Sequence, residues 1–393
     1  MDPDALRDAL DRWTDDEVID ESTADRIRAY EDRRSAETGA NSGQTAADLL
    51  GDRRLVAALA LMGGVLVAVG VGALLAERWE SIPTALRAAI LVAAPVAAGV
   101  AGHRLRGASP LTGRGLWLIA ALFTGVSVFL LADLAGLDVD ALEPWLLLAW
   151  TAVAIGIGTG LDSRPIGAVA VALGAATVIA AVDGNGLVIT GFYGGSAYAA
   201  GLLADDGLGT ESPVPRFAAT LRWVGGAFAV VVVAAVGIAG SPPPIAGDPG
   251  TVAVAIASAL AAAVVVVRTR RDEPDRNEAR YAAAPAVVAP IALGVAWAAG
   301  DLVGLGELGV AFVGLCSLLG LLVALVVAAI GLRETALVNV STLGFVLGVG
   351  TLLVGPITDA VPGSIALVAA GVILLVAGLG AERGRRTVLA RIS

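Results

Sequence analysis

The sequence has no lysine: all 26 of its basic residues are arginine. Aspartate and glutamate together number 36, so the net charge is −10 and the isoelectric point is about 4.7. Carboxylates hold water and cations well, whereas lysine carries a long apolar stem. This balance is typical of proteins from a salty cytoplasm, although a GC-rich genome also favours Arg, Ala and Gly. We expect a halophilic source, and we do not take the acidity as a sign of a basic partner.

Cysteine and histidine are also scarce, with one residue of each, Cys316 and His103. A single cysteine excludes a disulfide within the chain, and the two residues are too few for a Cys/His metal site. The segment Gly194-Gly195-Ser196 superficially resembles the surroundings of a serine nucleophile, but the only histidine lies at the end of another apolar run. There is no phosphate-binding loop and no paired aspartate motif in the apolar runs. We therefore expect no enzyme activity, no cofactor and no metal.

Apolar residues are abundant, at 57% of the chain with a mean hydropathy of +0.82. They fall in blocks of roughly 18–25 residues, the length that crosses about 30 Å of hydrocarbon as a helix. Because lipid offers no partner to free backbone groups, such spans must be helical. The sequence predicts an all-α polytopic membrane protein of about twelve transmembrane helices. The expected spans are 55–76, 85–102, 115–133, 143–161, 165–182, 186–204, 218–239, 251–267, 281–300, 306–331, 335–355 and 362–380.

Arginines alternate between the loops that join these spans. The even-numbered loops and the two termini carry nearly all of them, whereas the odd-numbered loops hold only Arg78 and Arg87 and are otherwise acidic. By the positive-inside rule, this alternation predicts twelve spans with both termini in the cytoplasm, in the plasma membrane. The arginine run 268–271 is interpreted as a topology determinant, with contact to anionic lipid as an alternative and nucleic acid not expected.

Residues 1–34 are too polar to cross a membrane and predict a small cytoplasmic helical hairpin. Asp2 and Asp20 are placed to cap its two helices. Apolar residues recur at helical spacing along both helices, namely Leu6, Leu10, Trp13, Ile27 and Tyr30. This stripe is the expected surface for self-association or for a protein partner. Residues 35–53 are then a flexible linker, 54–381 a transmembrane helical domain and 382–393 a cytoplasmic arginine-rich tail.

Several segments together resemble the prokaryotic predicted membrane proteins grouped as DUF2157. They are VIDESTADRIRAYE at 18–31, Arg53-Arg54-Leu55, the glycines of the first span, AERWESIP at 76–83, RETALVN at 333–339 and ERGRR at 382–386. Arg78 and Glu80 stand where the family pattern often has Asn and Asp around the tryptophan. The resemblance implies a multi-pass membrane protein and no known activity.

Two groups of residues are candidate sites. Arg78, Trp79 and Glu80 lie in the first outer loop and form either an interfacial turn or an outward-facing recognition site. GFYGGSAY at 191–198 is the densest polar cluster within a span. The candidate cavity-lining residues are Tyr193, Ser196, Tyr198 and Asn339. The alternative for this segment is close packing through small residues.

Ionisable groups at membrane depth are costly and so indicate function. The sequence places none near the centre of a span. Arg222 comes nearest, and we interpret it as an anchor at the inner membrane surface. Pro95, Pro285 and Pro290 fall within spans and are expected to kink them.

Two functions remain open. The first is a non-catalytic membrane component, a scaffold or sensor whose hairpin docks a partner or a second copy of the chain. The second is a transporter or permease for a small neutral or weakly polar solute, favoured by the number of spans, the prolines and the hydroxyl groups of residues 191–198.

Overall fold

The computed structural model describes most of the chain from residue 79 onward and three short pieces before it. The described residues are 13–14, 20, 22–27, 79–107, 109–182, 185–204, 213–239, 249–271, 277–301, 303–304, 306–360, 375, 378, 380, 382–386 and 388. The chain divides into two compact units, Met1–Pro83 and Thr84–Ser393. Each unit is described by itself.

In the first unit, residues 22–27 form a helix that is capped by Asp20. The Asp20 carboxylate accepts the backbone N–H of Thr23 at 3.0 Å and the Ser22 hydroxyl at 2.9 Å. The predicted cap is therefore confirmed. A short 3-10 helix, η1 (Trp79–Ser81), closes the described part of this unit. The hairpin's first helix and the linker lie outside the described residues except for Trp13 and Thr14, which are helical.

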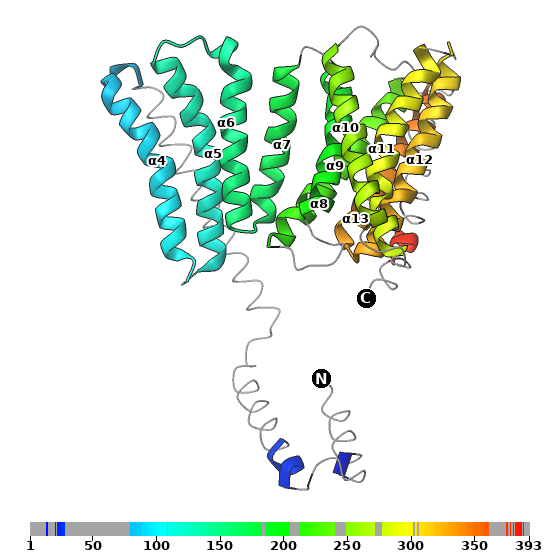
Figure 1. Ribbon diagram of the computed structural model, residues 1–393, viewed down its shortest axis with the longest axis horizontal. Helices are drawn as coiled ribbons and strands as arrows, with labels where there is room; N and C mark the ends of the chain where they lie inside the picture. The colour runs from blue at the N-terminus through cyan, green and yellow to red at the C-terminus, as the bar shows by residue number, and fades with distance from the viewer. Residues whose placement is uncertain are drawn as a thin grey trace. The chain divides into compact units, whose positions relative to one another are not determined.

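The second unit consists of helices joined by short connections (Figure 1). In chain order they are α4 (Thr84–Leu105), α5 (Pro110–Leu134), α6 (Val139–Gly160), α7 (Arg164–Ala181), α8 (Gly186–Ala204), α9 (Pro215–Ala239), α10 (Pro249–Arg271), α11 (Asn277–Asp301), α12 (Glu307–Leu332) and α13 (Thr335–Ala360). Within the described residues there is no strand. The predicted all-α polytopic class is confirmed.

Nine helices of the described part, α4 to α12, are long and apolar enough to cross a membrane. They correspond one by one to the predicted spans two to ten. α13 covers the predicted span eleven, and its shorter apolar stretch is Thr335–Gly348. Span one at 55–76, and nearly all of span twelve at 362–380, lie outside the described residues. The count of twelve stays a prediction.

The helices pack in two ways within this unit. α4 to α7 lie side by side in a row, whereas α8 to α13 cluster together (Figure 1). α8 and α9 are the most enclosed helices, because α8 contacts α7, α9, α10 and α11, and α9 also contacts α12 and α13. Their core combines Tyr198, Val233, Leu325 and Leu337, each fully or almost fully buried.

Glycines allow α8 and α9 to approach each other closely. A Cβ added to Gly194 would lie 2.6 Å from the carbonyl oxygen of Gly225, and one added to Gly225 would lie 2.5 Å from that of Gly194. Both distances are shorter than a carbon atom can tolerate. Small residues thus bring two backbones into contact at membrane depth, as is common between transmembrane helices.

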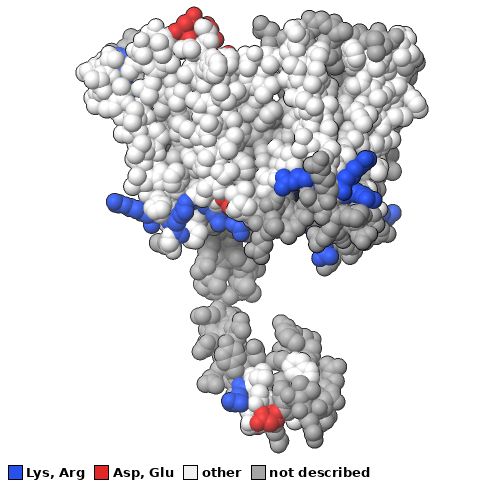
Figure 2. Space-filling view, in the orientation of Figure 1, with Lys and Arg blue, Asp and Glu red and all other residues white. Residues whose placement is uncertain are grey.

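Arginines gather at one end of the second unit, as Figure 2 shows. In the sequence, most arginines of the second unit flank the α4–α5, α6–α7, α8–α9, α10–α11 and α12–α13 connections, largely within the adjoining helix ends, or lie in the C-terminal segment. The opposite end carries the acidic α5–α6 connection, where Asp138 accepts the N–H of Ala141 at 3.2 Å and caps α6. The two ends of the bundle therefore differ in charge as the alternation of arginines predicts.

Candidate functional site

A buried ion pair joins α9 to the turn between α12 and α13. The Arg222 side chain is 3% exposed and that of Glu334 is 15% exposed. Two guanidinium nitrogens of Arg222, Nε and Nη2, donate to the same oxygen of Glu334, Oε1, with Nε at 3.0 Å. A third nitrogen, Nη1, donates to the carbonyl oxygen of Gly201 in α8 at 3.1 Å. One arginine thus links three parts of the bundle.

Local backbone geometry places both partners. Gly201 makes room for the arginine, because a Cβ there would lie 2.8 Å from Cγ of Arg222. On the other side, α12 ends at Leu332 and is followed by Arg333 in the left-handed conformation, with φ of 53°. The N–H of Glu334 then bonds to the carbonyl of Ala329 at 3.0 Å. This tight turn brings the Glu334 carboxylate onto Arg222.

Only one of the two carboxylate oxygens of Glu334 accepts hydrogen bonds from Arg222. Its second oxygen, Oε2, is buried and has no hydrogen-bond partner among the described residues. Such groups are uncommon because an unpaired buried acceptor is costly.

Tyr198 lies on the next turn of α8 from Gly201, and its hydroxyl donates to the carbonyl oxygen of Ala282 in α11 at 2.9 Å. The site therefore combines an ion pair with interhelical bonds among α8, α9, α11 and the α12–α13 turn.

The interpretation of Arg222 as a surface anchor is wrong. α9 begins at Pro215, ahead of the predicted start at 218, so Arg222 lies about two turns inside the helix. Its guanidinium is buried against neighbouring parts of the bundle, where it pairs with Glu334. Sequence reasoning also missed Glu334. The available signal was an acidic residue in a two-residue connection between two long apolar helices.

The four candidate cavity-lining residues lie in separate environments. Tyr193 packs near α7, where its hydroxyl occupies the space beside Gly174. Ser196 donates to the carbonyl oxygen of Phe192 in its own helix at 3.1 Å. Tyr198 is fully buried in the core. Asn339 of α13 accepts from Nε of Arg385 at 2.8 Å.

The outer-loop candidates are described only in part. Trp79 and Glu80 form η1 with Ser81, and the N–H of Ile82 bonds to the carbonyl of Trp79 at 3.2 Å. The indole is half-buried. Arg78 and the side chain of Glu80 lie outside what the structure describes. The segment is thus a compact turn over the residues that can be followed, and whether it is a recognition site stays a prediction.

Among the described residues, no group of three or more His, Cys, Asp or Glu side chains lies close enough to hold a metal ion. The Arg222–Glu334 pair can hold α8, α9 and the α12–α13 turn together by electrostatic attraction and hydrogen bonds.

Comparison with known proteins places the N-terminal part of the chain. Residues 11–167 match the family model DUF2157, described as a predicted membrane protein. The resemblance seen in the sequence is confirmed over this part, which includes the hairpin segment, η1 and helices α4 to α6. No curated protein and no solved structure matches the chain. The Arg222–Glu334 pair lies C-terminal to the matched residues.

Proposed function

We propose that this DUF2157-type membrane protein is a non-catalytic component of the plasma membrane, a scaffold or sensor. The observation that carries the proposal is the use of polar side chains within the bundle. Several of them bond to a polar side chain or a backbone carbonyl of a neighbouring helix and so fix helices in place, whereas others, such as Ser196 and Thr124, bond to a carbonyl of their own helix.

Four contacts illustrate this use. Ser127 of α5 donates to the carbonyl of Leu91 in α4, and Nε1 of Trp150 in α6 donates to the carbonyl of Ala121 in α5. A hydrogen bond of 2.9 Å joins the hydroxyls of Thr151 and Thr177 between α6 and α7. Tyr198 links α8 to α11. Hydroxyl groups that already bond to a neighbouring helix are not available to bind a solute. These contacts therefore favour a scaffold over a permease.

We infer further that the arginine-rich end faces the cytoplasm, in accord with the positive-inside rule. With span one crossing the membrane as the sequence predicts, the hairpin at residues 1–34 would be cytoplasmic and would be the part that meets a partner or a second copy of the chain. Trp13 supports this role, because its side chain is 44% exposed. Large exposed aromatic side chains are frequent at protein interfaces.

The proposal also excludes catalysis. Ser196, the only serine in a glycine-rich setting that resembles a nucleophile site, bonds to its own helix. His103, the single histidine, is exposed at the end of α4, a helix that does not pack on α8 among the described contacts. A nucleophile needs a base within hydrogen-bond reach.

Photo-crosslinking tests the scaffold role. Because the chain has no lysine, amine-reactive reagents are of little use, and a benzoylphenylalanine at position 13 is the better probe. We expect a light-dependent adduct of defined mass in intact cells, lost when Ile27→Asp is added. The same probe at Trp145, which is 67% exposed near the start of α6, is the matched control. A chain that stays uncrosslinked at position 13 would refute the role.

The transport alternative has one supporting observation, the ionisable pair Arg222–Glu334 inside the bundle. Flux of small neutral solutes into proteoliposomes distinguishes the two functions. The scaffold proposal predicts no flux above that of protein-free vesicles. Flux that is abolished by Glu334→Gln would overturn it in favour of a transporter.

A further inference from the structure

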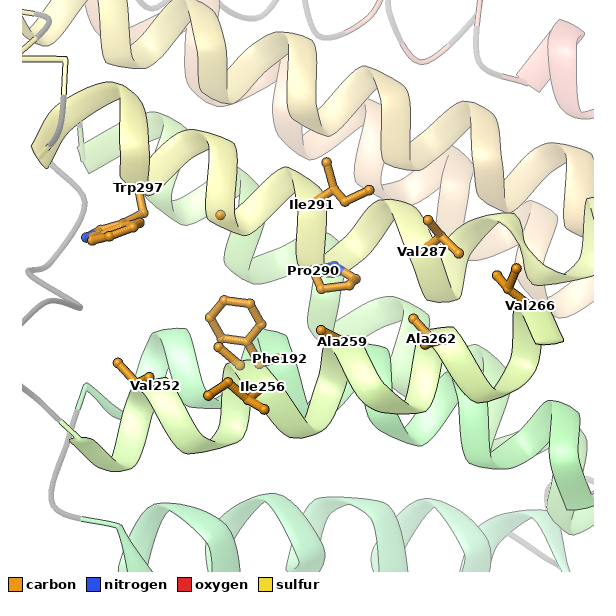
Figure 3. A pocket seen from close by; sticks show the side chains of 13 residues that line it. Phe192, Val252, Ile256, Ala259, Ala262, Val266, Val287, Pro290, Ile291 and Trp297 are labelled. Carbon is orange, nitrogen blue, oxygen red and sulfur yellow. The ribbon is translucent and has the colours of Figure 1, made fainter.

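A long apolar groove runs between α10 and α11. Its walls include Val252, Ile256 and Ala259 of α10 and Pro290, Ile291 and Trp297 of α11, and its volume is about 720 Å³. Figure 3 shows Pro290 and Trp297 on the side of α11 that is turned toward α10, with the Phe192 ring of α8 between the two helices. The alanines of α10 and Gly294 of α11 are small residues that leave the space between the two helices unfilled. The groove is therefore an open, apolar depression along the side of the bundle.

A second groove of about 610 Å³ continues the first toward the arginine-rich end. The two share Val266 and Val287, and the second is lined by Thr269, Arg270 and Arg280. Both arginines are exposed. The continuous cleft thus changes from purely apolar to cationic where the helices leave the membrane.

The cleft is long enough for an acyl chain. Along α10, the path from Arg270 to Val252 measures about 27 Å at 1.5 Å per residue, close to the roughly 30 Å hydrocarbon thickness. An acyl chain that starts at the arginines can therefore lie in the cleft along its whole length in one leaflet.

The cleft opens sideways to the bilayer. Ile256 and Ile291, on its two walls, are 55% and 56% exposed. Such side chains face lipid in a membrane-spanning bundle, so an occupant enters from the hydrocarbon and not from water.

We propose that this cleft binds an anionic glycerophospholipid from the leaflet at the arginine-rich end. One acyl chain lies between α10 and α11, and the phosphate lies between Arg270 and Arg280. Guanidinium groups pair with phosphate oxygens through charge-assisted, often bidentate hydrogen bonds. Basic pockets between transmembrane helices recognise anionic headgroups for this reason. The site depends only on the chain spanning a membrane, so it stands whether the protein is a scaffold or a transporter.

Binding of fluorescent phosphatidylglycerol to the full chain in detergent micelles, measured by anisotropy, tests the headgroup part. Phosphatidylcholine is the comparison ligand. We expect the Arg270→Gln/Arg280→Gln variant to lose about 25-fold in affinity for phosphatidylglycerol, about fivefold per arginine. Arg104→Gln/Arg106→Gln removes two exposed arginines from the α4–α5 end, and these helices lie apart from α10 and α11 (Figure 1), so affinity should be unchanged. Equal losses in both variants would overturn the proposal, because they would show attraction by net charge alone.

A second variant tests the acyl-chain part. A Cβ added at Gly294 meets no heavy atom within 4 Å, so Gly294→Leu fills the groove without disturbing the helices. We expect it to weaken phosphatidylglycerol binding at least tenfold while the melting temperature of the lipid-free protein is kept. Gly156→Leu, at an equally open position on α6, is the control. Unchanged binding in Gly294→Leu would refute the site. So would a wild-type chain that binds no phosphatidylglycerol and is destabilised by Gly294→Leu, since another segment would then fill the groove.

Discussion

The hydroxyl of Ser127 in α5 donates a hydrogen bond of 2.6 Å to the carbonyl oxygen of Leu91 in α4. Leu91 lies four residues before Pro95, which has no N–H to offer to that carbonyl. Ser127 thus supplies from a neighbouring helix the donor that the proline lacks. Both residues are buried, with exposed fractions of 4% and 7%. At membrane depth no water can take the place of the hydroxyl.

The Ser127→Ala variant should therefore destabilise the bundle by about 1 kcal/mol, within the range for an unpaired buried acceptor and for membrane hydrogen bonds. The Pro95→Ala background restores an N–H for Leu91, so there the same change should cost much less. SDS-driven unfolding in mixed micelles measures both free energies of unfolding. Thr124→Ala is the control, since that hydroxyl bonds only to Ala120 in its own helix. Equal costs in the two backgrounds would contradict the relationship.

Removal of either partner of the Arg222–Glu334 pair should lower the free energy of unfolding by about 3–5 kcal/mol, because a buried charge is left alone. Glu334→Gln and Arg222→Met are the single variants. The double variant Arg222→Met/Glu334→Leu should recover much of the loss, since an apolar pair of similar volume removes both charges.

Unfolding of the singles and the double in micelles gives the coupling energy of the pair. Arg216→Met is the control, because Arg216 is an exposed arginine of the same helix, and its change should lie within about 0.5 kcal/mol. Additive losses in the double variant would show that the two side chains do not act as a pair.

The membrane-spanning helices could be predicted because length and apolarity alone decide them. The predicted span 186–204 has the bounds of α8, and 165–182 differs from α7 by one residue at each end. The predicted ends of the spans were less accurate where the observed helix continues past the hydrocarbon. α9 begins at Pro215 and α10 reaches Arg271, because residues in the headgroup region can stay helical although they are polar.

The Arg222 site could not be predicted, because its partner is 112 positions away in the sequence. Periodicity reports which face of a helix is apolar but not which distant turn covers it. Likewise, Asp162 of the α6–α7 turn accepts the N–H groups of Arg216 and Phe217 at the start of α9, at 2.8 and 2.9 Å. The cap at Asp20 was predictable because the acceptor and the donor are three residues apart.

The close approach of α8 and α9 predicts that Gly194→Ala is strongly unfavourable. Its Cβ would lie 2.6 Å from the Gly225 carbonyl oxygen, a backbone atom that cannot move away alone. We expect a loss of about 1–3 kcal/mol in the free energy of unfolding, the usual cost of overpacking. Gly156→Ala in α6 meets nothing within 4 Å and should instead gain up to about 1 kcal/mol from helix propensity. The same micelle unfolding assay measures both, and equal effects of the two changes would show that the helices do not touch at Gly194.

The cap at Asp20 predicts a pH dependence for the helix at 22–27. Hydrogen bonds from the Thr23 side chain, the Ser22 hydroxyl and the Thr23 N–H hold the pKa of the Asp20 carboxyl below its ordinary value of 3.8. A lowered pKa in the folded state means that the cap favours the helix fully above pH 3.8 and loses its effect as pH falls through the lowered value. The carboxyl carbon shift of Asp20 in the full chain, assigned by its absence in Asp20→Asn, follows this titration. Its midpoint should lie below 3.8 in the wild type and move up toward 3.8 in Ser22→Ala/Thr23→Ala, which removes the side-chain donors. A wild-type midpoint at or above 3.8 would show that the carboxylate does not accept these bonds in solution.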